Sequence, residues 1–292
     1  MRMTSGRKGW LRLLVLLSAL LLLVAACGSE EPDDSAGGTG TATGTEPAEE
    51  EPQFSTIEEG VLQVGSCLDY KPFEFVKNGD EMGFDVELAE EIATRLGLEV
   101  QWVTANFDTI FTAVAAREFD MVAAASTITE ERLAEVDFSE PYFNARQGFS
   151  VNTNETPDIT SVDDLQEGDV VGVQKGTTGK AWAEENLAPK GIEIKTFDAA
   201  PDAFSDLEAG GVVGVVNDEG SSIAEVETRS GLEVVEAIDT DEHYGFAFSK
   251  DNPELTAAAN EALAEIIADG TYEQIFKKWF PDLPVPEEYA AS

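Results

Sequence analysis

The chain has 292 residues and a formal net charge of −40, with 18 lysines and arginines against 58 aspartates and glutamates. So few cations argue against a nucleic-acid partner or an anionic lipid surface, because contact with phosphates needs a basic surface. The excess of acid favours solubility and identifies no function by itself, but it makes each arginine informative.

The first 26 residues are typical of a secretory signal peptide. A basic start without acids precedes a leucine-rich run, residues 11–26, which is short for a membrane-spanning helix of roughly 20 residues. The run ends in Val24-Ala25-Ala26-Cys27, which resembles the lipobox of bacterial lipoproteins, where the cysteine is lipidated and becomes the new N-terminus. The alternative is ordinary secretion with an unmodified Cys27 thiol.

Residues 27–53 are predicted to form a disordered tether. They contain no bulky apolar residue, and such a segment buries too little surface to offset the entropy of ordering. A flexible chain of this length spans roughly 25–30 Å on average. A lipid on Cys27 would hold a folded body at the outer face of the cell membrane. Cys67 is the only other cysteine, so lipidation leaves no intramolecular disulfide.

From residue 54 onward, strand-like and helical patterns alternate. The apolar runs typical of strands cover residues 61–65, 100–103, 121–125, 170–173, 192–197 and 212–216. Segments with helical spacing lie between them. This alternation predicts an α/β fold with mainly parallel sheets.

Three helices are marked by apolar spacing and by residues typical of helix ends. Residues 85–96 form the first, with Asp85 at the N-cap and Gly97 just past the C-terminal end. Residues 253–268 form a long second helix. The third is expected to begin after Thr271 as N-cap, with Gln274 completing a capping box.

The stretch STITEER, residues 126–132, places an arginine just past a buried strand end. A cation in the first helical turn opposes the helix dipole, unless an anion lies there to be bound by backbone N–H groups and the guanidinium together. Arg132 is therefore a candidate anion-binding residue. The alternative is that Glu130, Glu131 or Asp137 supplies the anion, or that the guanidinium points into water.

Two further strand ends offer polar groups. The turn GTTGKAW, residues 176–182, can bring N–H groups close to an anion, but it lacks the GK[ST] ending of a nucleotide-binding P-loop. Asp218 ends the apolar run VVGVVND, where α/β folds place ligand-binding groups, although it could simply cap the next helix. An arginine, helix N-termini and a carboxylate together complement a zwitterion.

Two aromatic residues follow the strand ends of the first half of the chain. Tyr70 lies in GSCLDYKPFEF and Phe107 in ANFDTIF, and both could form flat apolar walls around a bound molecule. The alternative is that both belong to the core. No cluster of cysteine and histidine indicates a metal, and no nucleophile–base pair indicates catalysis, so neither a metal nor another cofactor is expected.

In their order, the motifs of the folded part closely resemble the polar-amino-acid solute-binding proteins of ABC importers, bacterial extracellular solute-binding protein family 3. The motifs that match are GVLQVG (60–65), YKPFEF (70–75), GFDVEL (83–88), TITEER (127–132), DFSEPY (137–142), GTTG (176–179), DGTY (269–272) and KWF (278–280). Each is modest alone, and their shared order makes the resemblance specific.

The resemblance implies a two-lobed, periplasmic-binding-protein-like α/β clamshell of type II that closes on a free amino acid. Lobe 1 would combine residues 54–145 with 243–292, and lobe 2 would be residues 146–242. Two hinge crossings would lie near residues 144–148 and 241–244. Such a protein acts as a monomer that delivers its ligand to ABC permease subunits, touching the membrane only through the lipid anchor.

The resemblance also implies roles for individual residues. The arginine at 132 would hold the α-carboxylate of the ligand, and an aspartate at 218 would hold the α-ammonium. The expected ligand-binding set is Tyr70, Phe107, Ala125 (through its carbonyl), Thr127, Arg132, Gln174, Thr178 and Asp218, with Cys67, Gly179 and Asn217 as further candidates.

The ligand is inferred from where the sequence departs from the family pattern. Position 67, often an acid in members that bind basic amino acids or glutamine, is Cys67. The side-chain pocket is therefore expected to be polar and uncharged, unless Asp69, Glu74 or Lys175 turns inward. Glutamine is the first expectation, followed by cystine or an acidic amino acid.

Two other functions are compatible with the same motifs. A cyclohexadienyl or arogenate dehydratase would need only an acid near the bound carboxylates, and Glu74 could serve. A sensory surface domain would bind the same ligand and signal instead of transporting. A lytic transglycosylase is excluded by length, because no residues remain for its catalytic domain.

Overall fold

The computed structural model describes residues 54–291, which contain all the binding residues predicted above. The predicted signal peptide, the tether and Cys27 lie outside the described residues. Within the described part of the chain, none of the helices has the length and apolar character that a membrane crossing requires.

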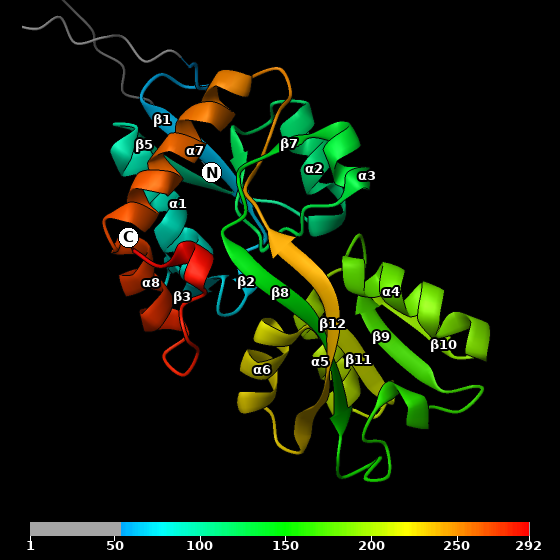
Figure 1. The fold of residues 1–292 in the computed structure, drawn as a ribbon. Coiled ribbons are helices and arrows are strands. Elements are labelled where there is room, and N and C mark those ends of the chain that lie inside the picture. The colour runs from blue at the N-terminus through cyan, green and yellow to red at the C-terminus, as the bar shows by residue number, and fades with distance from the viewer. Residues whose placement is uncertain (1–53, 292) are drawn as a thin grey trace, which may run out of the picture. The chain divides into compact units, whose positions relative to one another are not determined.

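One five-stranded sheet organises the first lobe (Figure 1). Its strands, in spatial order, are β5 (Glu99–Thr104), β1 (Val61–Ser66), β6 (Met121–Val122), β13 (Ala247–Phe248) and β7 (Asp137–Phe138). A small antiparallel sheet accompanies it, formed by β2 (Asp69–Tyr70), β3 (Glu74–Lys77) and β4 (Asp80–Met82). The helices of this lobe are α1 (Phe84–Arg95), α2 (Phe107–Ala115), α3 (Glu130–Glu135), α7 (Pro253–Ala268) and α8 (Thr271–Trp279). We call these elements the first lobe.

A second five-stranded sheet organises the second lobe. Its strands, in spatial order, are β10 (Glu193–Phe197), β9 (Val170–Gln174), β11 (Gly214–Asp218), β8 (Phe143–Asn152) and β12 (Leu232–Tyr244). Its helices are α4 (Thr178–Asn186), α5 (Ala200–Glu208) and α6 (Glu219–Glu227). Short 3-10 turns are η1 (Val162–Asp164), η2 (Ala188–Lys190) and, near the C-terminus, η3 (Glu287–Tyr289). The α/β class is as predicted.

The sheets are less parallel than expected. In the first, β1 is parallel to β5 and β6, but β13 is antiparallel to both of its neighbours. In the second, β9 is parallel to β10 and β11, whereas β8 is antiparallel to β11 and β12. The prediction of mainly parallel sheets was therefore wrong for one edge of each sheet.

Two long antiparallel strands, β8 and β12, connect the lobes (Figure 1). Their pairing runs from Leu232 opposite Asn152 to Tyr244 opposite Phe143. At its end β12 reaches the first lobe, where the amide of Ile128 donates to the carbonyl of His243 at 2.8 Å. These are the two hinge crossings expected of the two-lobed fold.

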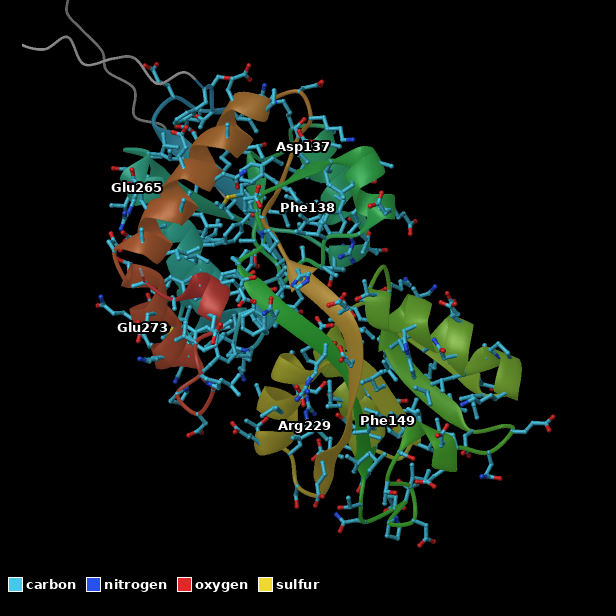
Figure 2. All side chains as sticks on the ribbon, in the orientation of Figure 1. Asp137, Phe138, Phe149, Arg229, Glu265 and Glu273 are labelled. Carbon is cyan, nitrogen blue, oxygen red and sulfur yellow. The ribbon has the colours of Figure 1, made fainter. Side chains whose placement is uncertain are left out.

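Each lobe has its own core (Figure 2). Aromatic rings fill much of the first, where Phe84 lies 5.5 Å from Phe280 and 5.7 Å from Phe143 between ring centroids. The second core is aliphatic around Phe149, which points inward from β8. Because burying a large apolar side chain contributes roughly 1.5–3 kcal/mol, each core is substantial enough to hold its lobe together.

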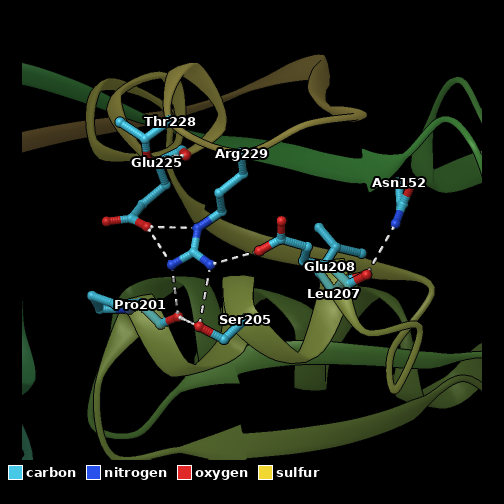
Figure 3. A network of polar contacts seen from close by, with 8 residues as sticks. All are labelled: Asn152, Pro201, Ser205, Leu207, Glu208, Glu225, Thr228 and Arg229. Atoms are coloured by element: carbon cyan, nitrogen blue, oxygen red, sulfur yellow. Dashed lines mark hydrogen bonds and ion pairs between the residues drawn. The ribbon is translucent and has the colours of Figure 1, made fainter.

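A network around Arg229 fixes helix α6 against helix α5 (Figure 3). Arg229 lies just past the end of α6, and its guanidinium donates to Glu225 of that helix, to Glu208 at 3.2 Å and to the carbonyl of Pro201 at 3.3 Å. The side chain of Glu225 is buried, so its ion pair with Arg229 is screened less by salt than the pair with the exposed Glu208. This network holds the helix that begins directly after Asp218.

The helix boundaries test the sequence reasoning locally. The helix at 253–268 is confirmed to the residue, and Gly97 has the left-handed φ of 70° expected past a helix end. The assignment of Asp85 as an N-cap was wrong. Gly83 is the N-cap, and Asp85 is buried, accepting from the amide of Ala125 at 2.8 Å and from the hydroxyl of Tyr142 at 2.7 Å.

The prediction of a capping box at Thr271 was also wrong. The N-cap is Gly270, which has a φ of 83°, and Thr271 is the first helical residue. Its side chain makes no capping hydrogen bond. The left-handed conformation of Gly270 is one that residues with a Cβ adopt rarely, so the glycine rather than the threonine sets this helix start.

Candidate functional site

A cavity opens between residues of the two lobes. Its lining from the first lobe and its loops is Cys67, Asp69, Tyr70, Glu74, Phe107, Ala124, Ala125, Thr127 and Arg132, and from the second lobe Gln174, Thr177, Thr178 and Asp218. A ligand here would touch both lobes at once.

The predicted residues converge on this cavity. All eight of the expected binding set line it, and so does Cys67. Gly179 and Asn217 lie outside the lining. A Cβ at Gly179 would come within 2.6 Å of the side-chain oxygen of Gln147, and Asn217 accepts a hydrogen bond from the hydroxyl of Tyr70 at 3.0 Å. These two residues support the lining from behind.

Arg132 is 9 % exposed, and its guanidinium faces the cavity. It donates to the carbonyl of Thr127 at 2.6 Å and, across the cavity, to the carbonyl of Gly176 at 3.0 Å. The guanidinium also lies over the rings of Phe107 and Phe111, at 5.2 and 4.5 Å from their centroids. Within the described residues it forms no ion pair, so Glu130, Glu131 and Asp137 do not supply its anion.

Burial lowers the pKa of Arg132 from 12.5 to about 10, which leaves the guanidinium charged at neutral pH. A buried cation without a paired carboxylate is costly unless an anion joins it. Its planar group can hold a carboxylate through two parallel hydrogen bonds. Arg132 is thus suited to bind a ligand carboxylate.

The side chain of Asp218 is placed to bind a ligand and does not cap the helix that follows it. It is the backbone N-cap of α6, but its side chain makes no capping bond. One carboxylate oxygen accepts from the hydroxyls of Tyr70 at 2.8 Å and Tyr244 at 2.7 Å, and the other from the amide of Gln147 at 2.5 Å. All three donors are neutral, so the negative charge of Asp218 has no cationic partner in the described residues.

Burial, followed by the charge of Glu242, raises the pKa of Asp218 to about 6. A cation at this position would restore the ordinary preference for the ionised form, because an opposite charge nearby favours the carboxylate. The carboxylate and the guanidinium of Arg132 line the same cavity. Together they can bind both ends of a zwitterion.

Glu242 is a site residue that the sequence reasoning missed. It lies on β12, is 8 % exposed, and accepts from the hydroxyls of Thr127 and Thr178, both at 2.7 Å. Gln147 and Tyr244 were missed as well. All three lie on β8 or β12, and Glu242 follows the acidic stretch DTD, from which sequence alone does not distinguish it.

Two further carboxylic acids lie among the lining residues of the cavity. Asp69 and Glu74 both line it, beside Cys67. Glu74 is 1 % exposed, and its Oε2 has no hydrogen-bond partner among the described residues. Burial raises the pKa of Asp69 to about 6, and burial with the charge of Asp85 raises that of Glu74 well above its usual range. Both acids therefore turn inward, and the raised pKa of Glu74 favours its neutral form unless a cation lies beside it.

Lys175 does not turn inward. Its ammonium pairs with Asp198 at 2.6 Å on the surface. Burial, with the charges of Glu74, Asp69 and Asp108, raises the pKa of the Cys67 thiol, so this cysteine is a neutral wall of the pocket. Among the described residues, no group of three or more histidine, cysteine, aspartate or glutamate side chains is arranged to hold a metal.

Comparisons with known proteins agree with this geometry. Residues 62–282 match the family of bacterial extracellular solute-binding proteins, family 3. The chain belongs to this family, and it is a binding protein of the amino-acid-binding class.

Individual relatives place it within that class. The chain is 32% identical over 225 residues to the L-cystine-binding protein TcyJ of Escherichia coli (strain K12), covering 76% of this chain and 84% of that one. Among solved structures, an ancestral arginine-binding protein bound to arginine is 40% identical, with a TM-score of 0.72 and coverage of 76% and 98%. An ancestral arginine-binding protein bound to glutamine is 39% identical, with a TM-score of 0.73 and coverage of 77% and 100%.

Proposed function

We propose that this protein captures a free amino acid between its lobes and delivers it to the permease of an ABC importer. The observation that supports this most is the pairing of Arg132 and Asp218, opposite charges without ion-pair partners in the described residues, in one cavity. Arg132 receives the α-carboxylate, and Asp218 with the carbonyl of Ala125 receives the α-ammonium. Tyr70 and Phe107 flank the side chain. Lobe 1 comprises residues 54–145 and 243–292, and lobe 2 residues 146–242.

The ligand is a cationic amino acid, with arginine as the first candidate and uncharged glutamine as the alternative to it. Glutamine was expected for an uncharged pocket, but two carboxylic acids, Asp69 and Glu74, line the same cavity as Arg132 and Asp218. A buried Glu74 with an unpartnered oxygen is costly unless a donor or a cation joins it. A guanidinium offers both, with five N–H donors. Two similar ancestral proteins are bound to arginine and to glutamine, which supports one of these two amino acids as the ligand.

Thermal-shift screening tests the ligand class. The panel is the twenty amino acids with cystine and ornithine. A ligand that binds only the native state stabilises it by about 2.7 kcal/mol at 100 times its dissociation constant. Arginine, lysine or ornithine should give the largest shifts. A shift with glutamine alone would reject the cationic class, and no shift with any amino acid would reject the function.

The protein acts as a monomer held at the outer face of the cell membrane by a lipid on Cys27. This proposal is supported by the lipobox-like Val24-Ala25-Ala26-Cys27 and by the polar segment that follows. Cys27→Ser should leave the protein unprocessed or release it into the medium. Recovery of a lipidated variant from membranes would contradict the anchor.

A further inference from the structure

The carboxylate of Glu242 accepts four hydrogen bonds. Its Oε2 receives the hydroxyls of Thr127 from the first lobe and Thr178 from the second, both at 2.7 Å. Its Oε1 receives the hydroxyl of Thr240 at 2.6 Å and the amide of Gln147 at 2.9 Å. A carboxylate has about four lone-pair sites, so its hydrogen-bonding capacity is filled.

Two of these donors, Thr127 and Thr178, belong to the expected ligand-binding set and line the cavity. A threonine hydroxyl carries a single hydrogen. While Thr127 and Thr178 donate to Glu242, neither hydroxyl can donate to a second carboxylate. A ligand carboxylate that bound between them could accept these hydrogen bonds only if the hydroxyls stopped donating to Glu242.

The backbone of β12 turns this acid inward. From Ile238 to Glu242 the strand passes four positions while its partner β8 passes only two, from Gln147 to Ala145. Asp241 has a left-handed φ of 51°, and its side chain is 98% exposed. Such an irregularity changes the direction in which side chains point. As a result, the carboxylate of Glu242 is buried, whereas that of the preceding residue, Asp241, is fully exposed to solvent.

Glu242 also acts by its charge. Within the described residues it forms no salt bridge, and its negative charge reaches both Arg132 and Asp218, favouring the charged form of the arginine and the neutral form of the aspartate. A second carboxylate entering beside Arg132 would meet this charge as well as the arginine. Like charges at such separations repel by an amount that grows as water is excluded.

We propose that Glu242 competes with the α-carboxylate of the ligand for the hydroxyl protons of Thr127 and Thr178, and so sets the affinity of the site below what Arg132 alone would give. This inference rests on the proposed function, since it needs an amino acid at Arg132. Glu242 is a positioning residue: it acts through the two threonines and touches no part of the ligand.

Isothermal titration calorimetry with two probes tests this competition. L-Arginine has the α-carboxylate, and agmatine has the same guanidinium and amine without it. Glu242→Gln removes the charge and weakens the acceptor while keeping the shape. It should bind L-arginine about three- to tenfold more tightly than the wild type, and agmatine within about twofold of the wild type. Asp241→Asn is the matched control, because it removes an exposed carboxylate one residue away and should change neither probe.

Each outcome has one meaning. If the wild type binds L-arginine and Glu242→Gln binds it no more tightly, or gains equally for agmatine, this inference is wrong and the proposed function stands. If the wild type does not bind L-arginine, the cationic ligand class fails and this inference fails with it. Should the variant not fold, a crystal structure of the wild type with L-arginine decides. At least one threonine hydroxyl should have moved from Glu242 to the ligand, and both remaining on Glu242 would overturn the inference.

Discussion

The guanidinium of Arg132 in the first lobe donates a hydrogen bond to the carbonyl of Gly176 in the second, over 3.0 Å. The same glycine approaches the first lobe at a second point. A Cβ built on Gly176 would lie 2.9 Å from the Cα of Asp108, closer than real Cβ contacts. The two lobes therefore meet at a place where only a hydrogen atom fits.

Gly176→Ala should weaken ligand binding by interfering with this approach. Gly176 has a φ of 73°, so alanine also adds left-handed strain of roughly 1–2 kcal/mol. We expect a loss of at least about tenfold in affinity for L-arginine. Gly168→Ala separates the two effects, because Gly168 has a φ of 93° and nothing within 4 Å of its would-be Cβ. Both variants should lose similar stability in urea. Equal binding by both variants would show that the contact with Asp108 does not matter.

Asp218→Asn should weaken the binding of α-amino acids selectively. Removing one partner of a desolvated charge pair costs about 2–5 kcal/mol, or tens- to thousands-fold in affinity. The comparison ligand is 5-guanidinopentanoic acid, which has the carboxylate and guanidinium of arginine but no amine. Calorimetry should show a large loss for L-arginine and a small change for the comparison ligand. Equal losses would mean that Asp218 does not hold the ammonium.

Affinity for L-arginine should fall as the pH drops from 7 to 5. Asp218 has a pKa raised to about 6, chiefly by burial, and the ligand ammonium favours its ionised form. Binding below about pH 6 must therefore release a proton, and this opposes association. The raised pKa of Asp69, also about 6, acts in the same direction for a cationic side chain. Calorimetry in buffers of different ionisation enthalpy measures the released proton. Affinity that is constant or rises towards pH 5 would contradict this assignment.

The two carboxylic acids that line the cavity besides Asp218 should select the ligand. Replacing Asp69 by Asn and Glu74 by Gln together removes two carboxyl groups while keeping their shape. Arginine affinity should fall about tenfold or more, because the guanidinium loses its charged partners. Glutamine affinity should change by less than about threefold, since the amides still offer hydrogen bonds. The outcome that would overturn the cationic proposal is an equal loss for both ligands.

The regular elements were predictable wherever burial follows a period. The strands β1 and β9 are mainly apolar, β5 alternates polar and apolar residues over most of its length, and the helix Pro253–Ala268 has a continuous apolar stripe. Helix starts were less predictable, because Gly83 and Gly270 begin helices through backbone conformation rather than side-chain caps. A sequence shows the presence of a glycine but not its φ.

The hinge was predicted only through resemblance. In β12, less exposed and exposed positions alternate from Glu236 to Tyr244, but polar residues such as Thr240 and Glu242 take inward positions, so the residue types show no apolar–polar alternation. The two extra residues between Ile238 and Glu242 also break the register. No local pattern reveals such a long, irregular strand.

The site residues also divide into those that the sequence could predict and those that it could not. Arg132 and Asp218 could be found because each stands at the end of an apolar run, where α/β folds place ligand groups. The inward direction of Glu74 could not, because β3 buries two successive residues before exposing the next two. Glu242 lies 115 residues from the hydroxyl of Thr127 that donates to it. Contacts over such separations depend on the fold and leave no local signal.

Calorimetry of L-arginine binding to Arg132→Ala, beside the wild type, tests the central claim most directly. Arg146→Ala is the control, because it removes a solvent-exposed arginine whose partner is Glu219 on the outside of the hinge. We expect micromolar or tighter binding to survive in the control and a loss of about tens- to thousands-fold in Arg132→Ala. Wild-type affinity in a folded Arg132→Ala protein would contradict the role of this guanidinium.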